Sequence, residues 1–141
     1  MDKKKKMKKI MILTVIMALS VSGISGVSVV SEFPVYTGPS DQRFPKIYGN
    51  IVVFEDNRGG NWGIYGYDLS TGTEFPISTN SRNDYSPEIY STIVVWFRYP
   101  QNSSSIFGYD LSTPTEFTIK DDPWCQRMCE VYSNIVVFFD N

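Results

Sequence analysis

A 42-residue internal repeat, four short strand patterns in each copy and no helical periodicity beyond the N-terminal segment predict an all-β fold made of β-propeller blades. Residues 45–54 return as 87–96 and again as 129–138, each time with an Ile-Val-Val run followed by an aromatic residue. Residues 64–71 likewise match 106–113, and the alignment needs no gap. Four strands in about 42 residues is the spacing of a four-stranded antiparallel blade.

The strand patterns of the first complete copy lie at residues 46–48, 51–54, 64–67 and 74–77. The run at 51–54 is β-branched and aromatic without alternation, which is typical of a strand covered on both faces. In a propeller the neighbouring blades supply that cover. Stretches rich in glycine, asparagine and serine separate the strands and predict loops and turns.

The N-terminal segment, residues 1–28, has the layout of a secretory signal peptide. Six lysines and one acid occur in the first nine residues, an uncharged apolar run follows at 10–19, and small residues fill 20–28. An uncleaved membrane anchor is the alternative, because residues 10–30 carry no charge and are long enough to cross a bilayer. With either outcome we expect the remaining chain to lie outside the cytoplasmic membrane.

The rest of the chain, residues 32–141, is predicted to be an incomplete propeller. In repeat register it comprises a lone fourth strand at 32–36, blades at 45–78 and 87–120, and a half blade at 129–141. Closed propellers generally have four or more blades. The chain is therefore interpreted as a fragment of a longer propeller, with self-association of several copies into one ring and a stable short arc as alternatives.

Charge limits the classes of partner. Beyond residue 28 the chain carries seven basic and fourteen acidic residues, so this part is acidic. Such a domain has no basic patch to neutralise phosphates, and we expect no nucleic-acid partner. A membrane contact is expected only through an uncleaved N-terminal segment.

No catalytic, cofactor-binding or metal-binding residues are predicted, and the chain is not expected to be an enzyme. It has no histidine and no Gly-x-Ser-x-Gly sequence, so a serine nucleophile would lack its base. Asp68 and Asp110 recur once per repeat and are interpreted as turn residues that accept local hydrogen bonds. The loop at 56–61 has oxygen ligands but not the acidic alternation of a calcium loop.

Five residues remain as candidate sites. Trp62 and Trp124 lie in predicted loops without an aromatic counterpart in the complete copies, so they are candidate contacts for a glycan or peptide. Cys125 and Cys129 are spaced for a local disulfide, which an oxidising compartment would favour, although they could also stay free. Asn102 begins an Asn-Ser-Ser glycosylation sequon.

The blade pattern resembles the TolB-like family of propeller repeats, which is abundant in exported proteins of bacteria and archaea. The resemblance covers residues 32–141 and rests on the Ile-Val-Val-aromatic strand, the Asp-Asn-Arg loop at 56–58 and the Ile-Tyr-x-Tyr-Asp-Leu-x-Thr-Gly segment at 64–72. Residues at the position where the family usually has tryptophan are Phe54, Trp96 and Phe138. Asn61 and Trp62 precede the third strand as they do in the family.

Two departures from the family pattern stand out. Gly63 and Ser105 occupy a position that is commonly aspartate. The second loop, at 99–103, lacks the Asp-Asn-Arg pattern, and Arg98 stands at the aspartate position. In related blades the aspartate and arginine are expected to tie the loop to the neighbouring sheet, so how firmly the second blade is held at this loop is left open.

The resemblance implies protein or polysaccharide contacts at a cell surface or in a periplasm. The predicted function is a non-catalytic, secreted binding or scaffold segment. Propellers of this kind also serve as accessory domains of prolyl oligopeptidase-like serine peptidases, so the alternative is a propeller piece of an exported hydrolase or lyase. A fold shared by so many proteins does not transmit a function.

Overall fold

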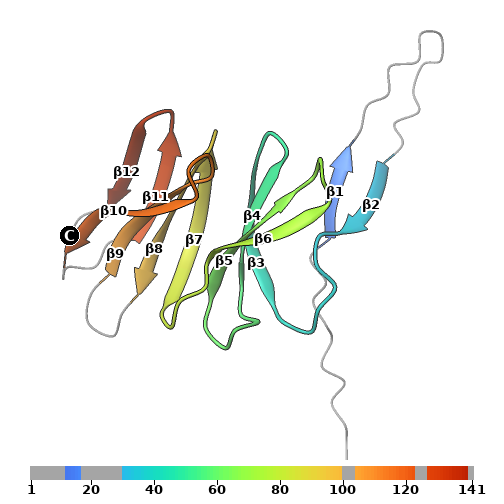
Figure 1. Cartoon of the computed structure of the whole chain (residues 1–141), viewed down its shortest axis with the longest axis horizontal. Helices are drawn as coiled ribbons and strands as arrows, with labels where there is room; N and C mark the ends of the chain where they lie inside the picture. Colours follow the sequence, from blue (N-terminus) through green and yellow to red (C-terminus); the bar gives the residue numbers. More distant parts are fainter. Residues whose placement is uncertain (1–11, 17–29, 100–103, 123–126, 140–141) are drawn as a thin grey trace, which may run out of the picture. The chain divides into compact units, whose positions relative to one another are not determined.

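The computed structural model describes residues 12–16, 30–99, 104–122 and 127–139 (Figure 1). Within these ranges the secondary structure is entirely β, as the sequence predicts. Among the described residues there is no helix with the length and apolarity needed to cross a membrane. The chain divides into two units, Met1–Pro39 and Ser40–Asn141, which are described separately.

The first unit contains one antiparallel strand pair, β1 (Ile12–Ile16) and β2 (Val30–Pro34). Its register runs from Ile12 opposite Pro34 to Ile16 opposite Val30. Strand β1 falls within the apolar run that the sequence analysis assigns to the signal peptide. A run of isoleucine, leucine, threonine and valine suits an extended strand as well as a leader segment. The signal peptide stays a prediction.

The second unit opens with a four-stranded antiparallel sheet, the first blade, in the order β3-β4-β5-β6. Its strands are β3 (Gln42–Tyr48), β4 (Ile51–Asp56), β5 (Gly63–Asp68) and β6 (Thr73–Ser78). The second blade repeats this order with β7 (Asn83–Tyr90), β8 (Ile93–Tyr99), β9 (Ser104–Asp110) and β10 (Thr115–Asp122). A third sheet pairs β11 (Arg127–Tyr132) with β12 (Ile135–Phe139).

The first strand of each complete blade is longer than its sequence pattern indicates. Strands β3 and β7 begin before Pro45 and Pro87, and each contains a β-bulge at that point. The residues before the two prolines, Phe44 and Ser86, both have a φ of 51°. A bulge shifts the alternation of side chains by one residue, so the strand before it does not continue the pattern that follows it.

The core lies between successive sheets. Val53 of β4 packs with Ile89, Val94 and Trp96 of the second blade, and all four are buried. Val95 of β8 packs in the same way with Cys129 of β11. Strand β8 is thus covered by a neighbouring sheet on each face, which confirms for the second blade the reason given above for its unbroken apolar run.

Candidate binding site

The structure describes only some of the predicted site residues. Trp124, Cys125 and Asn102 lie outside the described residues. Cys129 is buried beside Val95, and burial raises the pKa of its thiol to about 12. The disulfide between Cys125 and Cys129 and the glycosylation of Asn102 stay predictions.

Trp62 is half-buried and fixed by its backbone. Its N–H donates to Asn83 Oδ1 at 2.9 Å, and its carbonyl accepts the N–H of Asp84 at 2.8 Å. The guanidinium carbon of Arg43 lies 3.6 Å from the centre of the Trp62 ring. One face of this indole is therefore covered by a cation, and a ligand that approaches Trp62 from that side meets Arg43.

Arg43 lies on the wall of a groove between the first two blades, with a volume of about 500 Å³. We call it the inter-blade groove. Its lining comes from β3 and β4 on one side and from β7 and β8 on the other: Arg43, Phe44, Glu55, Tyr85, Ser86, Phe97 and Tyr99. The sequence analysis singled out none of these residues.

The floor of the groove holds a buried carboxylate. Glu55 is fully buried, accepts the backbone N–H of Ser86 at 2.6 Å and pairs with Arg43 Nε at 2.5 Å. Burial raises the pKa of Glu55, and the hydrogen bonds from Ser86 and Arg43 oppose that rise. Since Ser86 belongs to the next blade, the carboxylate also joins the two sheets.

The two bulges explain how the groove is built. At its bulge, β7 turns the N–H of Ser86 toward Glu55 of the preceding blade. At the equivalent bulge, β3 carries Phe44, whose side chain is 55% exposed. A left-handed φ at these residues is uncommon for side chains larger than glycine. The same backbone irregularity thus serves as an anchor in one blade and presents an exposed aromatic ring in the other.

Aromatic rings surround the Arg43 guanidinium. Besides Trp62, its carbon lies 5.4 Å from the centre of Tyr85 and 5.5 Å from that of Phe44. Tyr85 in turn contacts Phe97, with ring centres 5.5 Å apart. Cation–π contacts of this kind fix a charged side chain in place while leaving it available at the surface. The groove therefore presents a held cation among aromatic rings.

The described residues contain no group of three or more histidine, cysteine or acidic side chains that could hold a metal ion. The one fully buried carboxylate in the groove, Glu55, is already held by Arg43 and Ser86. This arrangement suits recognition of a partner group better than proton transfer or nucleophilic attack.

Asp56 and Arg58 form an ion-pair network within their own blade. Arg58 Nη2 lies 2.7 Å from Asp56 Oδ2, and the guanidinium also pairs with Glu74 of β6. These contacts connect the loop after β4 to the fourth strand of the same sheet.

The second blade has an ion-pair network at the equivalent place, although its loop lacks the Asp-Asn-Arg pattern. Arg98 Nε lies 2.8 Å from Asp84 Oδ1, and its Nη1 lies 2.9 Å from Glu116 Oε1. Glu116 is the repeat equivalent of Glu74. Arg98 Nη2 also donates to Ser78 Oγ at 2.9 Å, in the last strand of the first blade. The substitution of arginine for aspartate moves the network rather than removing it.

The interpretation of Asp68 and Asp110 as turn residues is confirmed. In each turn the aspartate Oδ1 accepts a hydrogen bond from the backbone N–H two residues on, Ser70 and Ser112 respectively, at 2.8 Å. Those hydrogen bonds, together with bonds from the serine hydroxyls, lower the pKa of both aspartates. The two carboxylates are thus engaged in shaping turns.

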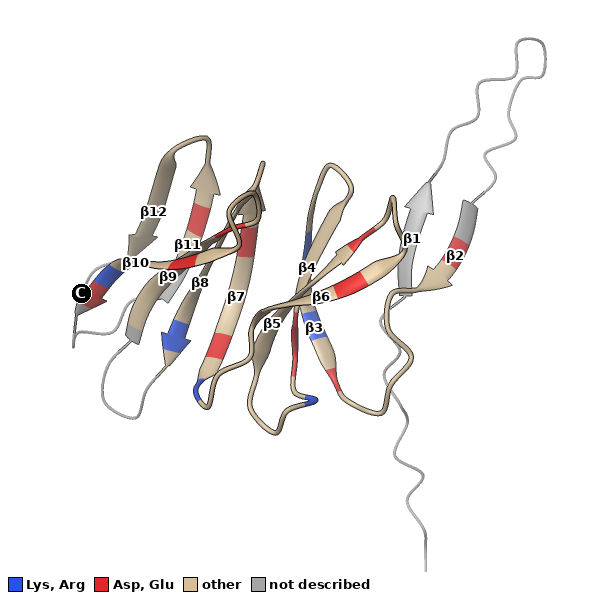
Figure 2. Cartoon of the chain, in the orientation of Figure 1, with Lys and Arg blue, Asp and Glu red and all other residues tan. Residues whose placement is uncertain are grey.

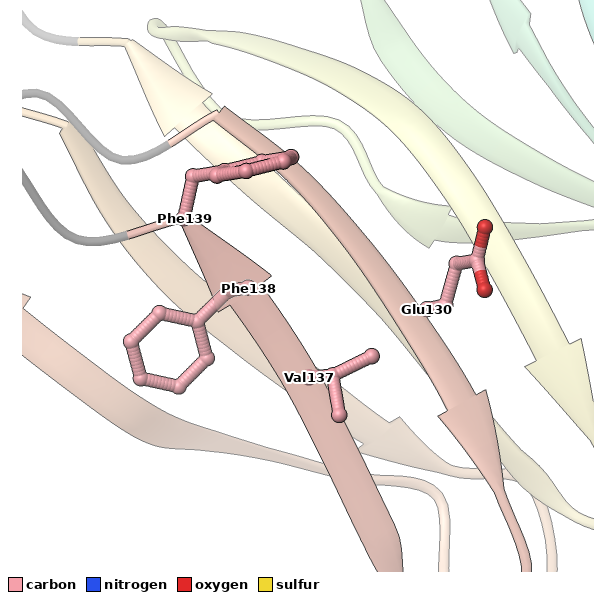
Figure 3. Close-up of a pocket in the computed structure, with 4 residues that line it drawn as sticks. All are labelled: Glu130, Val137, Phe138 and Phe139. Carbon is pink, nitrogen blue, oxygen red and sulfur yellow. The ribbon is translucent and has the colours of Figure 1, made fainter.

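A second, smaller cavity of about 250 Å³ lies on the third sheet (Figure 3). Figure 3 shows Glu130 on one strand and Val137, Phe138 and Phe139 on its neighbour. Val137 is 56% exposed, whereas its repeat equivalents Val53 and Val95 are fully buried under the following sheet. This sheet face is apolar and exposed, as expected of a blade face without a neighbour.

Comparison of the repeat copies would have indicated the groove. Arg43 and Tyr85 occupy equivalent positions, and so do Glu55 and Phe97. All four line the groove. An alignment of the repeats identifies the residues that recur, and it does not identify positions at which a charged residue in one copy replaces an aromatic residue in the other.

The chain matches no family model and no curated protein. Among solved structures it is similar to a protein assigned as TolB from Agrobacterium tumefaciens, with 17% identity and a TM-score of 0.53 over 62% of this chain and 36% of that one. It is also similar to TolB from Acinetobacter baumannii, with 19% identity and a TM-score of 0.58 over 71% of this chain and 26% of that one. The chain thus spans about a third of the first protein and a quarter of the second. The chain has the fold of a TolB-like β-propeller.

Proposed function

We propose that this chain is a non-catalytic, exported propeller segment that binds a protein at the cell surface or in the periplasm. The observation that carries the proposal is the inter-blade groove, where Arg43 is held by Glu55 among Trp62, Tyr85 and Phe44. Tryptophan, tyrosine and arginine are the residue types most enriched where protein interfaces gain their binding energy. The signal peptide predicted from the sequence supports export.

The distribution of charge limits the classes of ligand that the groove would bind. Figure 2 shows acidic residues spread over the strands of both blades and basic residues in few places, among them β3, which carries Arg43 and Lys46. At the groove the cation of Arg43 is partly exposed, beside the exposed rings of Phe44 and Tyr99. An extended peptide with an acidic side chain next to an aromatic or aliphatic one fits this arrangement. A glycan is the other class of ligand expected from the sequence.

A display library of random peptides and an immobilised glycan panel, both probed with the purified chain, would separate the two classes. We expect acidic-aromatic peptides to be selected, with affinities measured by calorimetry. Phe44→Asn, which tolerates the left-handed backbone, and Tyr99→Ser should each weaken binding at least tenfold, which is about 1.4 kcal/mol. Phe139→Ser alters a similarly exposed phenylalanine outside the groove and should leave the affinity unchanged.

Selection of glycans alone, or peptide binding that survives both groove substitutions, would contradict the proposal. Circular dichroism of each variant shows whether the β structure is intact, so that a loss of folding is recognised and not counted as a loss of binding. Tyr99 is the safer position, because its side chain is 47% exposed and its backbone does not have the left-handed conformation of Phe44.

We also propose that the two blades work as part of a larger propeller, completed by further blades or by other copies of the chain. The support is the exposed apolar face of β12, whose equivalents in the first two blades are covered. Light scattering of the purified chain distinguishes the two routes. A defined oligomer would indicate a ring of several copies, whereas an aggregating or non-cooperatively unfolding monomer would indicate that further blades are required.

A further inference from the structure

Three tyrosines form a row across the three sheets of the second unit. Tyr48, Tyr90 and Tyr132 are repeat equivalents, and each ends the first strand of its sheet. The ring centres of Tyr48 and Tyr90 are 4.9 Å apart, and those of Tyr90 and Tyr132 are also 4.9 Å apart. We call these residues the tyrosine row. They line neither the inter-blade groove nor the cavity on the third sheet.

The row is open to solvent at both ends. Tyr48 is 41% exposed and Tyr132 is 70% exposed, with Tyr90 half-buried between them. The ring of Tyr90 is tilted by 48° against that of Tyr48 and by 59° against that of Tyr132, so it contacts both neighbours. The charge of a neighbouring Tyr48 phenolate, followed by partial burial, raises the pKa of Tyr90, so Tyr90 remains a neutral phenol at ordinary pH. Core packing alone does not require a row of three tyrosine rings in contact, of which two are exposed.

We propose that the tyrosine row is a site of oxidative cross-linking, at which Tyr90 forms a dityrosine bond with Tyr48 or Tyr132. Each phenol first loses one electron and one proton to give a tyrosyl radical. A carbon–carbon bond then joins the two rings at positions ortho to the hydroxyls, and the ortho hydrogens move to the phenolic oxygens. The pair has lost two electrons and two protons, which a haem peroxidase transfers to hydrogen peroxide, reducing it to two water molecules.

Two other tyrosines of the chain have phenylalanine rings as stacking partners. Tyr65 stacks on Phe54 and Tyr85 contacts Phe97, and phenylalanine cannot complete a dityrosine bond. Within the row, the ring centres of neighbouring phenols are already 4.9 Å apart before oxidation, so radical coupling needs no diffusion of the rings. The bond would join the first strands of two sheets whose residues are 42 positions apart, and it would limit their separation on unfolding.

The test is treatment of the dilute purified chain with a haem peroxidase and hydrogen peroxide. We expect dityrosine fluorescence, a chain mass lower by two hydrogen atoms and a cross-linked peptide pair that contains Tyr90 with Tyr48 or Tyr132. Tyr90→Phe keeps the ring packing and should reduce intrachain cross-linking at least tenfold. Tyr48→Phe should remove only the pair between the first two blades and leave the pair of Tyr90 with Tyr132.

Tyr99→Phe is the matched control, because Tyr99 is about as exposed as Tyr48 but lies outside the row. It should leave the cross-linking yield unchanged. Oxidation that joins different chains only, or an intrachain yield that Tyr90→Phe does not alter, would overturn the proposal. Thermal unfolding of each phenylalanine variant before oxidation verifies that the fold is intact, and the cross-linked chain should melt at a higher temperature than the untreated one.

Discussion

The first two blades place a guanidinium group in the same surroundings by different routes. In the first blade Arg58 comes from the loop after β4, and its guanidinium carbon lies 4.0 Å from the ring centre of Tyr65. In the second blade Arg98 lies on β8 itself, 3.9 Å from the ring centre of Phe107. Tyr65 and Phe107 are repeat equivalents. A glutamate of the fourth strand completes both networks.

The partner acids have also changed places. Asp56 pairs with Arg58 in the first blade and stands opposite Gln42 in the sheet register. In the second blade the equivalents are Arg98 and Asp84, so the acid has moved from β4 to the first strand while the arginine has moved onto the second. The guanidinium group thus has the same surroundings in both blades, but it comes from a different position of the repeat in each. Both sheets therefore have a guanidinium group over the equivalent aromatic ring.

The groove shows the opposite relation. Arg43 and Glu55 of the first blade have Tyr85 and Phe97 as their equivalents, and these four side chains face one another across the junction. At these positions the first blade has charged side chains and the second has aromatic ones, and together they line the inter-blade groove. The guanidinium networks, which both blades have, stabilise the sheets, whereas the positions that differ between the blades form the candidate binding site.

The comparison predicts its largest effect at Arg98. Its side chain is almost fully buried and its removal leaves the buried carboxylate of Asp84 without its cation. Arg98→Met should lower the free energy of unfolding by about 3–5 kcal/mol, because one member of a buried pair is left behind. Urea denaturation followed by tryptophan fluorescence measures this loss. The exposed Arg82→Met is the matched control and should change little; an equal loss in both variants would contradict the role given to Arg98.

Arg58→Met should cost less, although it removes the same group from the same surroundings. Asp56 keeps the amide of Gln42 at 2.8 Å and the backbone N–H of residue 58 at 2.6 Å, so its carboxylate remains hydrogen-bonded. Asp84 would likewise keep the hydroxyl of Ser78 and the amide of Asn80, so the difference between the two variants rests on the greater exposure of Arg58. The expected loss is about 1–2 kcal/mol in the same denaturation experiment. A loss as large as that of Arg98→Met would contradict the role given to exposure.

A smaller effect, visible only as a dependence on pH, is predicted for Glu55. Burial raises the pKa of Glu55 in the folded chain above its ordinary value of 4.5. The folded chain then binds more protons than the unfolded chain, so the stabilisation from this group is complete below 4.5 and is lost as pH rises through the folded pKa. Glu55→Gln has no such titration.

Unfolding free energies of the wild type and Glu55→Gln, measured at intervals from about pH 4 to about pH 8, test this difference. The stability of the wild type should fall relative to that of the variant as pH increases above 4.5. Parallel curves, or a wild type that gains on the variant with rising pH, would contradict the raised pKa. The second blade has Phe97 at this position and makes no comparable contribution.

The fold could be predicted from the sequence because the same strand and turn sequences recur in successive copies. Three copies of an Ile-Val-Val run and two copies of an Asp-Leu-Ser-Thr turn identify four-stranded blades without knowledge of any contact. The residues that recur do not predict the groove, which is indicated only by positions at which the copies differ, Arg43 against Tyr85 and Glu55 against Phe97. Its shape also depends on the bulges at Phe44 and Ser86, where the backbone is left-handed, and neither phenylalanine nor serine is a residue type that predicts this conformation.

Arg98 illustrates a different limit. In the alignment it replaces the aspartate of the first copy, which indicates a lost interaction when positions are compared one by one. Its new partner, Asp84, lies 14 residues earlier and pairs with it only because β7 and β8 are neighbours in register. A compensating charge at a cross-strand position becomes visible once the sheet is known.

The most direct test of this account transfers the second network into the first blade. The triple substitution Gln42→Asp, Asp56→Arg and Arg58→Met gives β3 and β4 the charges that β7 and β8 carry. Its free energy of unfolding in urea is compared with that of Arg58→Met alone. If the position of the cation in space is what the sheet requires, the triple variant regains most of the loss of about 1–2 kcal/mol. A triple variant that is no more stable than Arg58→Met would contradict it.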